Sequence, residues 1–167
     1  SSREQELASI AGFCHDMGNF MGRTLHHYWG SLLFHQVFQH EMPPREATMI
    51  AQAIANHDKE EMKFTNKVSA VLVLADKSDV SRSRVEKRPI DQIKQDVHDR
   101  VNYAVLTSKL GLEKKKKRIV LELTVDANFV PVMEYFEIFT ERMSYCRKAG
   151  AYLGWEFGLV INNFKLL

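Results

Sequence analysis

The amino-acid sequence predicts a mainly α-helical fold with a small C-terminal strand–helix–strand extension, and hence an α+β chain overall. Two observations lead to this prediction. Apolar residues recur every three or four positions along most of residues 1–112, and they alternate with polar residues in two short stretches further on. No repeat or low-complexity linker separates the two parts. We therefore expect one domain, in which residues 1–112 form a helical body and residues 113–167 pack on it.

Four helices are expected in the first half of the chain. The first ends at Gly18 and Gly22, and the second runs from about Thr24 to His40. The third follows "MPPRE", since proline is tolerated in a first turn. The fourth spans "KVSAVLVLADKSDV", whose length and charged tail favour a buried helix over a strand. Their apolar faces contain Leu7, Ile10, Ala11 and Cys14; Ile50, Ala53 and Ile54; and Val68, Val71, Leu72 and Ala75.

The second half begins with a polar loop, "SRSRVEKRPID", followed by a fifth helix over about Asp96–Leu110. The stretch "RIVLELTVD" alternates apolar and polar residues and is predicted as a strand. A long helix from Val132, closing at Gly150 or Gly154, and a strand in "WEFGLVI" complete the extension. Apolar strands at a chain end need to be covered, so a homodimer through this extension is a candidate assembly.

Composition restricts the class of protein. The 167 residues suffice for one domain with a proper core. A net charge of +2 gives no reason to expect nucleic acid as a partner. Cys14 and Cys146 lack metal-binding spacing and are predicted to be buried thiols in a reducing cytoplasm. No apolar run approaches the ~20 residues of a membrane span, and no signal peptide is visible, so we expect a cytoplasmic protein without membrane contact.

Polar residues interrupt these apolar faces at four places. Each alone is more often a hydrogen-bonded core residue or a helix cap than a ligand. Asp76 ends the run "VLVLA", where a carboxylate is costly to bury unless it is paired or binds a cation; it could equally be solvated just past the buried part of its helix. Several helices could bring the four places together at one metal ion. They are His15–Asp16, His26–His27, His57–Asp58 and Asp76.

In this order the residues resemble the motif of the HD-domain metal-dependent phosphohydrolases. His15–Asp16 in "AGFCHDMGN" is similar to the family's His–Asp pair, and Asp76 in "VLVLADKSD" is similar to its final aspartate. His26 and His57 match the two histidines that members with a longer motif add between them. The resemblance covers about half of the chain and implies an HD-type helical bundle for residues 1–112.

The resemblance also implies one or two divalent ions, of manganese, iron, nickel, zinc or magnesium. His15, Asp16 and Asp76 would be metal ligands, and a metal-activated water would attack phosphorus in line. His26 and His57 would bind a second ion, or contact the phosphate and protonate the leaving oxygen. The substrate would be a phosphomonoester or phosphodiester, with a nucleotide expected. His27 and Asp58 would orient the ligating imidazoles.

One position of the family motif has no counterpart. The family's first histidine lies on a helix well upstream of the pair, whereas the 14 residues before His15 contain no histidine. We therefore expect either that the helix carrying this ligand is missing from the sequence, or that the metal site is incomplete. The second case gives an alternative function: a catalytically degenerate HD module that binds a metal or a nucleotide and acts in regulation or assembly.

Three cations follow Asp76 in the sequence: Lys77, Arg82 and Arg84. They could bind phosphate and neutralise charge that grows on its oxygens, or they could belong to a solvated basic loop. A second His–Asp pair, His98–Asp99, is followed by no histidine that could complete a site and is expected to open a helix. The segment "EKKKKR" is expected to be a solvated turn.

Overall fold

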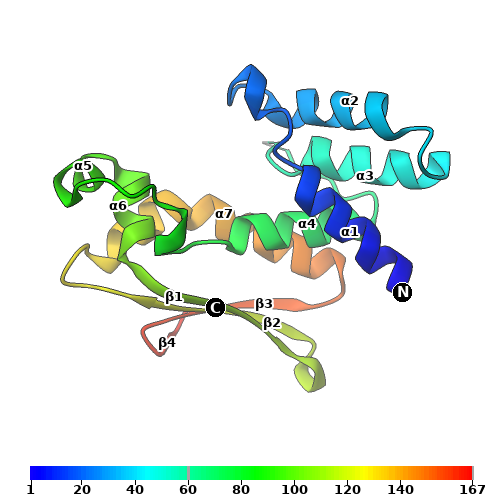
Figure 1. The fold of residues 1–167 in the computed structure, drawn as a ribbon. Helices are drawn as coiled ribbons and strands as arrows, with labels where there is room; N and C mark the ends of the chain where they lie inside the picture. Colours follow the sequence, from blue (N-terminus) through cyan, green and yellow to red (C-terminus); the bar gives the residue numbers. More distant parts are fainter. Residues whose placement is uncertain (60, 167) are drawn as a thin grey trace. The chain divides into compact units, whose positions relative to one another are not determined.

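The computed structural model describes residues 1–59 and 61–166, which contain seven α-helices, three short 3₁₀ helices and a four-stranded sheet (Figure 1). The prediction of a mainly α-helical, α+β chain is therefore confirmed. The chain divides into two compact units, residues 1–76 and residues 77–167, here called unit 1 and unit 2. The division expected after residue 112 falls inside unit 2, at the end of its first strand.

Unit 1 is helical, and its four α-helices match the four that the sequence predicts. The loop between the second and third helices is short, so α2 and α3 form an antiparallel hairpin and lie side by side (Figure 1). The bounds are α1 Ser2–Cys14, η1 Asn19–Met21, α2 His26–Phe38, α3 Pro44–Asn56 and α4 Lys67–Ser78, of which the last two residues lie past the unit boundary.

The core of unit 1 contains most of the apolar positions expected from the spacing, but Val71 and Ala75 of α4, expected on the buried face, are exposed. α1 begins with a capping box between Ser1 and Glu4, and an ion pair from Arg3 to Glu46 links it to α3. Ser31 on α2 donates a hydrogen bond of 2.8 Å to the carbonyl of Ala51 on α3. The buried core residues are Leu7, Ala11, Cys14, Phe34, Ile50, Ala53, Ile54, Val68 and Leu72.

Unit 2 contains the predicted strand–helix–strand arrangement. Strands β2 and β3 are parallel neighbours joined by the long helix α7, while β1 pairs with β2 and β4 pairs with β3 in antiparallel fashion. The bounds are η2 Arg82–Arg84, α5 Ile90–Gln95, α6 Val97–Ala104, β1 Val105–Glu113, η3 Lys114–Lys116, β2 Arg118–Val125, α7 Val132–Tyr152, β3 Glu156–Ile161 and β4 Phe164–Lys165.

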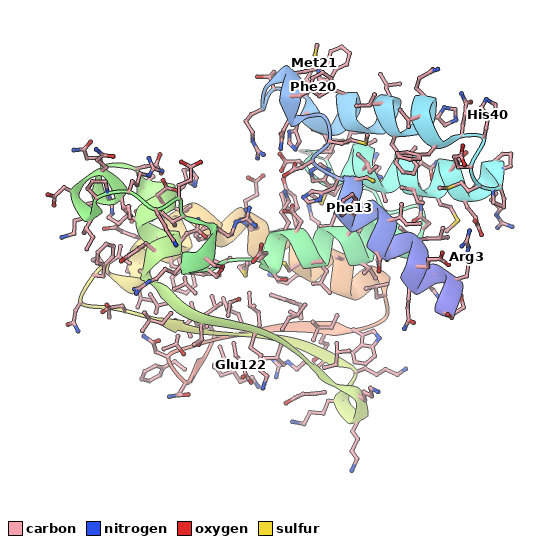
Figure 2. The ribbon with its side chains drawn as sticks, in the orientation of Figure 1. Arg3, Phe13, Phe20, Met21, His40 and Glu122 are labelled. Carbon is pink, nitrogen blue, oxygen red and sulfur yellow. The ribbon has the colours of Figure 1, made fainter. Side chains whose placement is uncertain are left out.

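Helix α7 lies over one face of this sheet (Figure 1). The side chains that face it alternate along the strands, as expected, and are almost fully buried; they are Ile119, Leu121 and Leu123 of β2 and Phe157, Leu159 and Ile161 of β3. Glu122 projects from the opposite face (Figure 2). The alternation of apolar and polar residues that predicted the strands therefore reflects the burial of every second side chain against one helix, α7.

The predicted fifth helix over Asp96–Leu110 is wrong in its second half. Helix α6 ends at Ala104, and residues 105–113 form strand β1, which pairs with β2 from Val105 opposite Val125 to Glu113 opposite Arg118. Val105 and Thr107 are β-branched and favour a strand, and β2 offers a full row of backbone partners. For residues 105–113, backbone pairing with β2 therefore outweighed the helical spacing of their apolar residues. Helix α5, which begins at the end of the expected polar loop, was also not predicted.

Two predictions from composition can be compared with the structure. Cys14 and Cys146 are buried and are not joined in a disulfide, as expected, and burial raises the pKa of the Cys14 thiol. Across residues 1–59 and 61–166, no helix is both long enough and apolar enough to cross a lipid bilayer.

Candidate metal centre

Four helix ends of unit 1 carry the predicted ligand residues. His15 directly follows α1, His26 begins α2, and His57 directly follows α3. Because α2 and α3 are antiparallel, the start of α2 lies beside the end of α3, and His26 Nε2 is 3.1 Å from His57 Nε2. Asp76, in the last turn of α4, has its Oδ1 3.9 Å from His15 Nε2. These helix ends lie close together, so residues up to 61 positions apart in the chain form one cluster.

The three imidazoles are oriented by the same local hydrogen bond. In each, Nδ1 lies close to the backbone carbonyl three residues earlier: His15 to Gly12 at 2.7 Å, His26 to Arg23 at 2.9 Å, and His57 to Ile54 at 2.7 Å. A carbonyl oxygen can only accept, so each Nδ1 must carry the proton and donate it. In the neutral ring this leaves a lone pair on Nε2, which is the form that binds metals.

Asp16 lies between these Nε2 atoms. Its Oδ1 is 3.3 Å from His26 Nε2 and 3.7 Å from His57 Nε2, while its Oδ2 is 3.5 Å from His15 Nε2. The two oxygens of one carboxylate therefore face different histidines. His26 and His57 are almost fully buried, whereas the Asp16 side chain is 43% exposed, so the cluster opens to solvent on the carboxylate side.

The contact between His26 and His57 requires a positive charge. Both rings use their Nδ1 protons on carbonyls, so two neutral rings would place two lone pairs against each other at 3.1 Å. Either a proton sits on one Nε2 or a cation binds both. Two nitrogens bound about 2.0–2.1 Å from one ion, at an angle of about 90–109°, lie about 2.8–3.4 Å apart. The observed separation lies within that range.

The chemistry of the donors fits a divalent metal. One ligand atom each from His15, Asp16 and His57 lies within 4.8 Å of the others, so these three residues could hold a metal ion. Mixed imidazole and carboxylate donors suit first-row transition metals. His26 and Asp76 add a nitrogen and an oxygen on either side of this group, at the distances given above.

The electrostatics of the cluster favour an ionised carboxylate at Asp16. The pKa of Asp16 is held well below its usual range by a hydrogen bond with His57 and by the charges of His15 and Arg23, although partial burial opposes the shift. Burial also lowers the pKa of His27, with a further contribution from His26 and His57. An ionised carboxylate is the state that a metal needs in such a ligand.

A close contact between two backbones holds the cluster together. Gly18 and Gly30 pack directly against each other: a Cβ on Gly18 would lie 2.0 Å from the His26 carbonyl oxygen and 2.5 Å from Gly30 N. A Cβ on Gly30 would in turn lie 3.3 Å from the carbonyl oxygen of His15. These glycines let the segment after His15 reach the start of α2, which brings Asp16 to His26.

A cavity of about 460 Å³ lies next to the cluster. Asp58 belongs to both, since its Oδ2 is 3.8 Å from His26 Nε2 and it lines the cavity. Leu25, which precedes His26, has a left-handed backbone with φ of 59°, a conformation that costs a non-glycine residue about 1 kcal/mol. This backbone conformation places the Leu25 side chain at the wall of the cavity. The lining residues are Leu25, His27, Tyr28, Asp58, Lys59 and Glu61.

The remaining predicted site residues have partners in unit 2. Lys77 is almost fully buried at the end of α4. Arg82 donates to the Tyr103 carbonyl at 2.6 Å and lies 4.2 Å from the centroid of that ring, and Arg84 pairs with Asp79 at 2.6 Å. The role of these three cations in binding phosphate stays a prediction.

Sequence reasoning did not find the cavity or the glycine contact. Leu25, Tyr28, Lys59 and Glu61 carry no motif, and only the fold shows that they line one space. The Gly18–Gly30 contact had a signal, because a glycine inside a helix is unfavourable unless another chain segment passes close to it.

Comparison of the chain with protein-family models, with curated proteins and with solved structures found no match.

Proposed function

We propose that unit 1 is an HD-type helical bundle and that this chain is a metal-dependent phosphohydrolase. The observation that carries the proposal is the orientation of the histidines: three Nδ1 atoms face backbone carbonyls, and the three Nε2 atoms are gathered around one ionised carboxylate. The motif order in the sequence supports the same conclusion independently. A metal ion bound to both Nε2 atoms would account for the separation of 3.1 Å between His26 and His57.

The proposed ligand assignment follows the distances. His15, Asp16 and Asp76 would hold one ion, and His26 and His57, which also lie beside Asp16, would hold a second. When bound, such ions polarise a phosphoryl oxygen and lower the pKa of a coordinated water. The buried backbone carbonyls keep each imidazole fixed in one orientation, so little reorganisation is needed when a metal binds.

The cavity beside Asp58 is the proposed place for the substrate. Lys59 offers a cation for a phosphate, while Leu25 and Tyr28 offer apolar contact for the group attached to it. Asp58 is within reach of both the cavity and His26, so it can hold a proton for a leaving oxygen. A phosphorylated small molecule, with a nucleotide as the first candidate, is the proposed substrate. The cytoplasmic location and the homodimer stay predictions.

The test is hydrolysis by the chain loaded with Mn²⁺ after removal of its own metals. Substrates are p-nitrophenyl phosphate, bis-p-nitrophenyl phosphate and a panel of nucleotides. We expect metal-dependent release of product, lowered by more than about 100-fold in His57→Gln. His40→Gln is the matched control, because His40 is exposed on the turn after α2 (Figure 2), and its activity should be unchanged.

The outcome that contradicts the enzymatic proposal is equally clear. A chain that binds Mn²⁺ but hydrolyses none of these substrates would be the degenerate HD module, acting in regulation or assembly. A chain that hydrolyses them equally well after His57→Gln would place the activity outside this cluster.

A further inference from the structure

Unit 2 contains a cavity that the metal centre does not use. It has a volume of about 630 Å³, which lies in the range of small-molecule binding sites. One wall is a single face of α7, because Ser144, Arg147, Lys148 and Ala151 recur at helical spacing, and the other wall is the start of β3. The residues that line it are Arg118, Ser144, Arg147, Lys148, Ala151, Trp155, Glu156 and Phe157.

The charge of this cavity suits an anion. Three cations, Arg118, Arg147 and Lys148, line it together with one carboxylate, Glu156. Among residues 1–59 and 61–166, neither Arg147 nor Lys148 belongs to an ion pair, and both side chains are exposed. Lys148 Nζ lies 5.5 Å from the centroid of the Tyr145 ring, a contact that leaves its three protons available. The positive charges of Arg147 and Lys148, on the α7 wall of the cavity, are therefore available to a bound anion.

The third cation, Arg118, occupies the space left by the absence of a side chain at Gly158. A Cβ on Gly158 would lie 2.8 Å from Arg118 Nε, 2.9 Å from Nη2 and 3.0 Å from Cζ. The guanidinium of Arg118 therefore lies flat against the backbone of the neighbouring strand, in the space that any other residue would fill. Arg118 and Glu156 are paired positions on β2 and β3, so the arginine reaches the cavity across the sheet.

Trp155 adds a flat aromatic surface beside these cations. It is partly exposed and directly follows Gly154, whose φ of 78° ends the turn after α7 and places the ring at the cavity. Arginine and lysine bind phosphate oxygens, and an indole stacks on a nucleobase. We propose that this cavity binds a nucleoside polyphosphate, with its phosphates on Arg118, Arg147 and Lys148 and its base on Trp155.

This site is independent of the proposed phosphohydrolase activity, and the experiment keeps the two apart. The chain has two tryptophans, so Trp29→Phe leaves Trp155 as the only indole fluorophore. The titration uses that variant with Asp16→Asn added, in the presence of EDTA, so that the metal centre contributes no binding. ATP is the probe, and pyrophosphate and adenosine supply its two halves separately.

We expect saturable quenching of Trp155 fluorescence by ATP, with weaker binding of pyrophosphate and adenosine. Arg147→Glu with Lys148→Glu should raise the Kd for ATP at least about tenfold. The matched control is Lys114→Glu with Lys115→Glu, the same change of charge on the exposed turn before β2, which should leave the Kd within twofold. Gly158→Ala should also weaken binding, because its Cβ displaces the Arg118 guanidinium, while the circular dichroism spectrum stays that of the parent.

Three results would overturn the proposal. The first is the absence of saturable quenching up to millimolar ATP. The second is equal weakening by the turn variant and the cavity variant, which would indicate attraction by overall charge. The third is tighter binding of a single-stranded oligonucleotide than of ATP, weakened both by the Arg147→Glu, Lys148→Glu variant and by the Lys114→Glu, Lys115→Glu variant. That result would make this surface a nucleic-acid site.

Discussion

The chain contains the dipeptide His–Asp at three places, and two of them, His15–Asp16 and His98–Asp99, here called the first and the second pair, have different surroundings. At His15–Asp16 the imidazole donates to the Gly12 carbonyl and the carboxylate faces three histidine Nε2 atoms. At His98–Asp99 the imidazole is exposed, and the Asp99 backbone N–H donates to the side chain of Asp96, the N-cap of α6, at 2.9 Å. The Asp99 carboxylate forms an ion pair with Arg88.

The difference is one of position relative to a helix. The first pair follows the end of α1, where the chain turns and other helix ends of unit 1 converge. The second pair lies in the first turn of α6, where Asp96 and Asp99 satisfy free N–H groups and the helix dipole. This role for the second pair was predicted from the sequence and is confirmed. The same two residues thus serve a candidate metal centre in one place and a helix start in the other.

Replacing each carboxylate by its amide tests this comparison with the largest expected effect. Asp16→Asn removes the negative charge shared by three histidines, and we expect the phosphohydrolase activity of the Mn²⁺-loaded chain to fall by more than about 100-fold. Asp99→Asn should leave it within about twofold, since that carboxylate only meets Arg88. Initial rates at saturating substrate measure both. Equal losses in the two variants would remove the distinction between the pairs.

Separating the helix ends should be nearly as damaging, and it acts on the fold. Gly18→Ala would bring a methyl group to 2.0 Å from the His26 carbonyl oxygen, so we expect a loss of about 3 kcal/mol in the free energy of unfolding. Gly12→Ala is the control, because a Cβ there meets nothing within 4 Å and alanine favours a helix by up to about 1 kcal/mol. Urea denaturation measures both. A Gly18→Ala variant as stable as the parent would contradict the described contact.

The second pair is expected to matter only for the stability of its helix. Asp96→Ala removes the N-cap hydrogen bond to the Asp99 N–H, and we expect a loss of about 1 kcal/mol in the free energy of unfolding. Metal content and activity should not change. Loss of bound metal in this variant would show that the second pair contributes to the metal site after all.

The smallest expected effect is a pH dependence of the metal-free chain. The pKa of Asp16 is lower in the folded protein than in the unfolded chain, so its contribution to stability is present above about pH 4 and is lost as the pH falls. The difference in unfolding free energy between the parent and Asp16→Asn should therefore be larger at pH 7 than at pH 3. Urea denaturation in EDTA at both values measures it, and a constant difference would contradict the assigned environment of Asp16.

The sequence predicted the helices of unit 1 because their periodicity is local, and it predicted the ligand set because a motif names residue types in order. It could not show that α6 stops at Ala104, since strand β1 depends on pairing with β2, and the sequence predicted β2 as a strand without indicating its partner. Nor could it show that His26 and His57 meet, because that contact depends on how α2 and α3 turn back on each other. The tautomers of the histidines follow only from the carbonyl positions.

The most direct test of the account is the metal content of the chain itself. The protein is stripped with a chelator, loaded with Mn²⁺, freed of unbound metal by gel filtration and subjected to elemental analysis, beside Asp16→Asn and Asp99→Asn. We expect near-stoichiometric manganese in the parent and in Asp99→Asn, and its loss in Asp16→Asn. Manganese that is absent from all three proteins, or retained equally by Asp16→Asn, would contradict the claim that the helix ends of unit 1 form a metal centre.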